Sequence, residues 1–134
     1  MKKINLKRKG TNAERELVHM FWNNSWAAIR VAGSGSSQFP SPDVLASNAI
    51  RRLAIECKST KDDTKYISNE GINQLKEFSV KFGAEAWIGV RFDVHKWFFL
   101  NLEDLDQKKE SYAISLELAR QKGLSFDELV GKFS

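Results

Sequence analysis

Two acidic residues and a lysine have the types and the spacing most typical of a catalytic site in this sequence. In the apolar run over residues 53–58, a strand period of two places Glu56 and Lys58 on the same face. A hairpin with its turn centred at position 49.5 pairs Asp43 with Glu56, because both lie 6.5 positions from that centre. The sequence therefore predicts that the two carboxylates are cross-strand neighbours.

Two carboxylates that face each other across strands need a compensating charge. Facing Cβ atoms in an antiparallel pair are only ~4.5–5.5 Å apart, so like charges there destabilise the sheet. A divalent cation between Asp43 and Glu56 would remove this repulsion, and oxygen ligands favour Mg²⁺ or Mn²⁺. Lys58 would then lie close enough to position a water or to offset phosphate charge. The alternative is that Glu56 and Lys58 are solvated residues on the outer face of a half-exposed hairpin.

A third carboxylate, Glu14, lies in line with an apolar helical stripe. Its spacing from Leu17, Val18 and Phe21 places it on the face that must pack against the sheet. Carboxylates are seldom buried unless they are paired or bind a metal, so Glu14 is a candidate third ligand. The alternative is that Glu14 completes a capping box with Thr11, three residues before it.

A mixed set of helices and strands must position these side chains. Apolar periodicity, capping signals and breaks at Gly and Pro predict the following elements: a helix from Thr11 to Asn24, strands over 26–31, 43–46 and 53–57, a helix over 68–82, strands over 86–92 and 96–100, a helix from Tyr112 to Gly123, and a last helix capped by Ser125 and Glu128. A Gly/Ser-rich loop over 33–37 separates the first two strands. We expect an α/β domain with a central mixed β-sheet of about five strands flanked by helices.

Composition favours one globular domain over residues 1–134. Of the 134 residues 42% are apolar and 28% are charged, and no repeat or linker-like stretch divides them. One cysteine, Cys57, excludes an intramolecular disulfide, and with two histidines it completes no common zinc site. No apolar run approaches the ~18–20 residues of a membrane span. We expect a soluble intracellular protein without a membrane partner.

Positive charge is concentrated in the N-terminal half. Residues 1–67 contain 12 Lys and Arg against 6 Asp and Glu, and residues 68–134 contain 9 against 11, so the net charges are +6 and −2. Five of the first nine residues are basic, a density that suits phosphate contacts by counterion release. We expect residues 1–9 to form a flexible basic arm. The alternative is a solubilising, frayed terminus.

The region around the two acidic residues also resembles a known nuclease motif. Pro42-Asp43, twelve intervening residues and then Glu56-Cys57-Lys58 resemble the signature of the PD-(D/E)xK nuclease superfamily. Together with the segments 7–17 and 29–36, this motif makes the chain resemble the archaeal Holliday junction resolvase family over roughly residues 7–100.

The resemblance implies a restriction-endonuclease-like fold and a homodimer in which each subunit cuts one of two opposing strands of a four-way DNA junction with Mg²⁺. It matches Glu14, Asp43 and Glu56 to the family's metal-binding acids and Lys58 to its catalytic lysine. The carbonyl of Cys57 is a further candidate ligand, and Mn²⁺ is a candidate substitute ion. The remaining matches are Ser34 as a catalytic residue, and Lys7, Arg8, Lys9, Arg15 and Arg30 as DNA-binding residues.

The function expected from this resemblance is Mg²⁺-dependent resolution of four-way junctions in recombination and repair. It needs no small-molecule cofactor, and it would take place in the cytoplasm in association with the nucleoid. Two alternatives stay open: a PD-(D/E)xK nuclease that cuts duplex or flap DNA, and a DNA-binding relative without catalysis. The second is disfavoured because the three acids and the lysine are all present.

Overall fold

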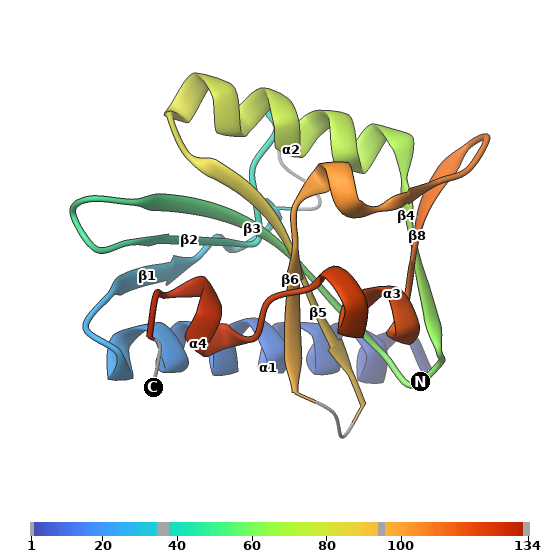
Figure 1. The fold of residues 1–134 in the computed structure, drawn as a ribbon, viewed down its shortest axis with the longest axis horizontal. Coiled ribbons are helices and arrows are strands. Elements are labelled where there is room, and N and C mark those ends of the chain that lie inside the picture. Colours follow the sequence, from blue (N-terminus) through green and yellow to red (C-terminus); the bar gives the residue numbers. More distant parts are fainter. Residues whose placement is uncertain (1, 35–37, 94–95, 133–134) are drawn as a thin grey trace.

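A five-stranded sheet with helices on both sides forms the centre of the molecule (Figure 1). The computed structural model describes residues 2–34, 38–93 and 96–132, with the backbone alone over residues 2–9. Helix α1 (Lys2–Asn23) runs along one face of the sheet, and α2 (Asn69–Phe82) lies over the opposite face. The predicted α/β class and the flanked mixed sheet are confirmed.

The central sheet is mixed because one pair of neighbouring strands is parallel. Its strands are β1 (Ala27–Arg30), β2 (Val44–Ser47), β3 (Arg52–Thr60), β5 (Glu85–Phe92) and β6 (Trp97–Leu100), in the order β1-β2-β3-β5-β6. Strand β3 pairs with β5 in parallel, and the other neighbours are antiparallel. The parallel pair needs a long crossover, which α2 supplies between β3 and β5.

Two apolar layers attach the helices to the sheet. On one face, Leu17 and Phe21 of α1 pack with Ile55 of β3, and the short helix α4 (Phe126–Leu129) joins the same cluster. On the other face, Ile72 of α2 packs with Ile88 of β5, together with α3 (Leu116–Lys122). Burying each such side chain contributes roughly 1.5–3 kcal/mol. The buried residues of β3 therefore alternate between two cores, with Leu53 and Ile55 in one and Ala54 in the other.

The hairpin between β2 and β3 has the predicted register. Val44 pairs with Ile55 and Ser47 pairs with Arg52, which centres the turn between positions 49 and 50. Asn48 holds this turn, because its Oδ1 accepts hydrogen bonds from the backbone N–H groups of the two residues before β3, at 3.0 and 2.7 Å. The local sequence of the turn thus determines which residues face each other across the two strands.

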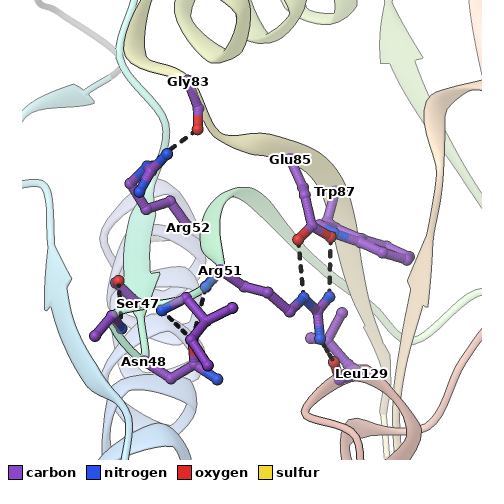
Figure 2. Close-up of polar contacts among 10 residues, drawn as sticks. Ser47, Asn48, Arg51, Arg52, Gly83, Glu85, Trp87 and Leu129 are labelled. Carbon is purple, nitrogen blue, oxygen red and sulfur yellow. Dashed lines mark hydrogen bonds and ion pairs between the residues drawn. The ribbon is translucent and has the colours of Figure 1, made fainter.

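Arg51 ties this turn to β5 and to the C-terminal helix. Its guanidinium donates to both carboxylate oxygens of Glu85, at 2.8 and 2.9 Å, and to the carbonyl of Leu129 at 2.6 Å (Figure 2). The indole of Trp87 donates to the same carboxylate at 3.1 Å. We refer to Arg51, Glu85, Trp87 and Leu129 as the Arg51 cluster. It joins three segments that are far apart in the sequence.

Helix α2 occupies the range predicted for it, residues 68–82, to within one residue. The Oγ of Ser68 accepts a hydrogen bond from the N–H of Gly71 at 3.0 Å and so caps the first turn. At the other end Gly83 adopts a φ of 78°, and its N–H donates to the carbonyl of Ser79. Both ends of α2 are thus capped, and packing of its buried residues Ile72 and Leu75 attaches it to the sheet.

Helix α1 begins earlier than expected. The predicted start near Thr11 is wrong, since the helix runs from Lys2 and the proposed capping box therefore lies inside it. Lysine, leucine and arginine are good helix formers, so the segment before Gly10 continues the helix. The backbone of residues 2–9, expected to be a flexible arm, is helical. Although α1 has 22 residues, no helix in the described part of the chain is long and apolar enough to cross a membrane.

A second, smaller sheet was not predicted from the sequence. It contains β4 (Thr64–Ser68), β7 (Asp106–Gln107) and β8 (Ser111–Ser115), in the order β4-β8-β7, and η2 (Leu102–Asp104) leads into it. The predicted helix from Tyr112 is wrong over its first residues, which form β8 before α3 begins. Pairing with the distant β4 decides this conformation. The last helix, with its capping box of Ser125 and Glu128, is confirmed.

Candidate active site

Asp43 and Glu56 lie opposite each other beside the β2–β3 pair. The register pairs Val44 with Ile55, so the next facing residues along the two chains are Asp43 and Glu56. The N–H of Asp43 donates to the carbonyl of Ile55 at 3.1 Å, which continues the ladder to this point. Both carboxyl groups line one cleft of about 160 Å³. The predicted cross-strand neighbours are confirmed.

The carboxylate of Asp43 accepts hydrogen bonds at both of its oxygens. Ser34 Oγ donates to Oδ1 at 2.7 Å, and the backbone N–H of Cys57 donates to Oδ2 at 2.8 Å. Asp43 is only 9% exposed, so these bonds are shielded from water. Hydrogen bonds to an ionised carboxylate are strong and directional. The Asp43 carboxylate is therefore oriented before any substrate binds. Ser34, predicted as a site residue, contributes one of the two hydrogen bonds that orient it.

Glu56 carries a charge that its surroundings do not fully compensate. Burial raises the pKa of Glu56 to about 7, and the negative charge of Asp43 and a hydrogen bond between the two carboxyl groups add to that rise. Lys58 opposes it, since its Nζ lies 3.6 Å from Glu56 Oε2. The side chain of Glu56 is 23% exposed. A perturbed carboxyl group that lines a cleft is typical of a functional site.

Glu14 lies near this pair but is already engaged by another residue. Its Oε1 is 3.5 Å from Arg30 Nη1, and both side chains are largely buried. Burial and the charge of Asp43 raise the pKa of Glu14, while Arg30 lowers it. Glu14 therefore does not point into bulk solvent, as its place on the apolar stripe of α1 predicts. The charge of Asp43 raises the pKa of Glu14, but the two carboxyl groups do not form a metal-binding cluster in the described residues.

The predicted ligands Glu14, Asp43 and Glu56 do not form a preassembled three-carboxylate metal site in the described part of the chain. Among residues 2–34, 38–93 and 96–132, no group of three or more His, Cys, Asp or Glu side chains is placed to hold a metal ion. Asp43 and Glu56 are the predicted ligands that share a cleft, and Glu14 is paired with Arg30. The Cys57 side chain packs against the apolar layer below the sheet, where burial raises the pKa of its thiol. Only its backbone faces Asp43.

The predicted DNA-binding residues occupy different environments. Arg15 is exposed on α1, one position from Glu14, whereas Arg30 is half-buried in its ion pair. The side chains of Lys7, Arg8 and Lys9 lie outside the described residues, although their backbone belongs to α1. The loop residues 35–37 also lie outside them.

Seven residues that the sequence did not predict as site residues also line the cleft, among them Phe39 and Gln74. Phe39 comes from the loop between β1 and β2, and Gln74 comes from the first turns of α2. Gln74 donates from Nε2 to Glu70 Oε1 at 3.2 Å. For Gln74, the spacing along α2 indicates only that the side chain lies away from the core. For Phe39, the one sequence signal for a place near the site is its position four residues before Asp43. Segments that precede and follow the Asp43–Lys58 motif in the sequence thus both line the cleft.

Comparison with known proteins identifies the family of this chain. The family model described as archaeal Holliday junction resolvase (Hjc) matches residues 5–134. The chain belongs to this family. Family membership, predicted from the motif around Asp43 and Glu56, is therefore confirmed.

Individual relatives carry the same description. The crossover junction endodeoxyribonuclease Hjc of Archaeoglobus fulgidus is 41% identical over 128 residues, covering 96% of this chain and 93% of the relative. The crossover junction endodeoxyribonuclease Hje of Sulfolobus acidocaldarius is 36% identical over 101 residues, covering 73% of each chain. Both share more than the short motif, because the match extends over most of the length.

The fold agrees with a solved structure from the same family. A structure of Archaeoglobus fulgidus Hjc, described as a Holliday junction resolvase from an archaeal hyperthermophile, matches with a TM-score of 0.86 at 36% identity. The match covers 94% of this chain and 98% of that chain. The predicted sheet flanked by helices is therefore the fold of an Hjc resolvase.

Proposed function

We propose that this protein, an endodeoxyribonuclease of the Holliday junction resolvase family, cuts four-way DNA junctions with Mg²⁺ held at Asp43 and Glu56. The observation that carries the metal proposal is the facing of these two carboxyl groups in one cleft, with the pKa of Glu56 raised to about 7. Negative charge that Lys58 compensates only in part, on oxygen ligands, suits a hard divalent cation.

The residues present fit such an ion in their chemistry. Asp43 and Glu56 would hold it, with Mn²⁺ as a substitute, and the carbonyl of Cys57 is a further candidate ligand. Glu14 would add a third carboxylate if it left its ion pair with Arg30. When bound, Mg²⁺ lowers the pKa of a bound water and offsets negative charge on the reacting phosphate.

The chain's own groups supply orientation and proton handling. Ser34 and the N–H of Cys57 fix the plane of the Asp43 carboxylate, which saves the cost of ordering it during the reaction. Lys58 points along the same face as Glu56, where its ammonium group would orient the attacking water and stabilise the charged phosphate. In this proposal Lys58 and the two carboxylates therefore act on the same phosphodiester.

Basic residues around the site would hold the DNA backbone. Arg15 is exposed beside Glu14 on α1, and the N-terminal segment adds the basic residues of positions 2–9. Phosphate contacts of this kind give affinity that falls as the salt concentration rises. Association with chromosomal DNA in the nucleoid would follow from the same contacts.

A homodimer would explain paired cuts in a two-fold substrate. Helix α2 carries an apolar surface that suits such an interface, because Phe82 is 50% exposed and stacks on Phe78 at a ring distance of 5.0 Å. Exposed aromatic surface is common in subunit contacts. Two copies related by a two-fold axis would present two clefts to two opposing strands. Light scattering of the purified protein tests this point.

The cleavage experiment compares a labelled four-way junction with a linear duplex of the same sequence, in Mg²⁺ and in EDTA. We expect paired symmetric nicks in the junction alone, and only with Mg²⁺. Asp43→Asn should lower the single-turnover cleavage rate at least about 100-fold. Junction binding in EDTA should persist, because phosphate contacts do not involve this carboxylate.

Glu103→Gln is the matched control, since Glu103 is an exposed acid outside the cleft. It should cut at the wild-type rate. Equal cutting of duplex and junction would exclude junction selectivity. Cutting in EDTA, or wild-type cutting by Asp43→Asn, would exclude the proposed metal site.

A further inference from the structure

An aromatic side chain projects from the rim of the catalytic cleft. Phe39 is 71% exposed, and it lines the same cleft as Asp43 and Glu56. The other large exposed aromatic side chains do not line this cleft: Trp22 lies on α1, Tyr66 on β4 and Phe82 on α2. Among the described residues, Phe39 is thus the exposed aromatic side chain that borders the reacting carboxylates.

The chain around Phe39 holds it close to Asp43. Pro40 follows it directly and restricts Phe39 to an extended backbone. The hydrogen bond from Ser34 to Asp43 joins two points on either side of this segment, so the loop is closed at its base. Four residues span at most ~14 Å, which equals about four base steps along one DNA strand at ~3.4 Å each. The ring can therefore reach only nucleotides within about four base steps of the bond that is cut.

An exposed ring in this place suits an unstacked base. Stacking of a base on an aromatic side chain contributes about 1–3 kcal/mol and is independent of sequence, because every base has a flat face. Bases inside a continuous duplex are already stacked on both sides, and removing them costs a few kcal/mol. At the branch point of a four-way junction the stack is interrupted, so a base there is more easily exposed. The ring would thus favour branched over continuous DNA.

We propose that Phe39 stacks on an unpaired base at the branch point and thereby selects the junction over duplex DNA. This proposal rests on the proposed cleavage of four-way junctions and adds to it the residue that recognises the branch. In this role Phe39 determines specificity, whereas Asp43 and Glu56 carry the chemistry.

The first test measures binding of the full-length protein in EDTA to a four-way junction and to a matched duplex. Phe39→Ala should weaken junction binding roughly 5- to 150-fold and leave duplex binding within about twofold. Phe39→Trp should restore junction binding, whereas Phe39→Leu should not, because leucine keeps the apolar bulk without a flat ring. Tyr66→Ala is the matched control, since Tyr66 is 61% exposed on β4 and does not line the cleft.

The second test detects the stacked base directly. A junction carries the fluorescent base 2-aminopurine at single positions from one to five nucleotides from the branch point. We expect wild-type protein to quench one of these positions next to the branch point, and Phe39→Ala to bind at saturating concentration without that quenching. The same label in the duplex should be unchanged.

Three outcomes would overturn the proposal. These are equal loss of junction and duplex binding, full junction selectivity in Phe39→Ala, or a change in oligomeric state of Phe39→Ala without DNA, which would assign the ring to a contact between two protein copies. Thermal unfolding of each variant checks that the fold is intact. Failure of the wild-type protein to nick the junction with Mg²⁺ would instead overturn the proposed function, so the two failures are distinguishable.

Discussion

Two glutamates on neighbouring strands have opposite electrostatic environments. Glu85 begins β5 and belongs to the Arg51 cluster, where hydrogen bonds from Arg51 lower its pKa (Figure 2). Glu56 lies in β3, the strand that pairs with β5, and burial together with Asp43 raises its pKa to about 7. The charge of Glu85 is thus compensated by Arg51, whereas that of Glu56, on the neighbouring strand, is only partly compensated by Lys58.

The difference separates a contact that maintains the fold from one that is available for chemistry. A guanidinium binding both carboxylate oxygens satisfies the negative charge within the protein and leaves little for a ligand to offer. Two facing carboxylates retain a repulsion that a cation or a proton can relieve. Repulsion between two carboxylates in a cleft therefore indicates a functional site more clearly than a well-paired ion such as Glu85 does.

The largest expected effect comes from neutralising each glutamate and measuring cleavage of a four-way junction. Glu56→Gln should lower the single-turnover rate at least about 100-fold, because it removes a negative charge that we propose binds Mg²⁺. Glu85→Gln is the matched control and should cut at close to the wild-type rate. Comparable losses in both variants would show that the two regions are not separable in this way.

The pH dependence of stability should differ in sign between the two sites. The folded-state pKa of Glu56 is raised, so its favourable contribution is complete below its ordinary value of 4.5 and is lost as pH rises through about 7. In EDTA, the free energy of unfolding of Glu56→Gln should therefore increase relative to wild type between pH 5 and pH 8, by at most about 3 kcal/mol.

For Glu85 the pKa is lowered, so its contribution is present above 4.5 and is lost as the pH falls through the folded-state value. Glu85→Gln should accordingly lose stability relative to wild type at neutral pH and approach it in acid. Chemical denaturation at several pH values measures both. Parallel pH profiles for the two variants would contradict the assigned environments.

The smallest effect should come from breaking the Arg51 cluster. Arg51→Ala removes hydrogen bonds to Glu85 and Leu129 and should lower the free energy of unfolding by about 1–2 kcal/mol, since the pair is partly exposed. Arg51→Lys should recover only part of this, because an ammonium group lacks the two-pronged geometry. Denaturant unfolding measures both variants, and full recovery by lysine would exclude a role for that geometry.

Local signals predicted the elements nearest the site. The turn around Asn48 and the alternation of β3 determined that Asp43 faces Glu56, and the helix predicted over residues 68–82 agrees with α2. The two errors have different causes. The β8 segment is a strand because the distant β4 lies beside it. Helix α1 begins at Lys2 because good helix formers before Gly10 extend it past the capping signal at Thr11.

The resemblance of the sequence to known resolvases indicated the family. The sequence by itself also determined the pairing of the two carboxylates and the place of the lysine beside them, because strand period and turn position act over a few residues. Only the tertiary structure decided that Glu14 is held by Arg30, that Ser34 binds Asp43, and that Phe39 and Gln74 border the cleft. These contacts join separate segments, and their partners depend on how the helices pack on the sheet. The charge of each site residue therefore follows from the sequence, whereas its compensation follows from the fold.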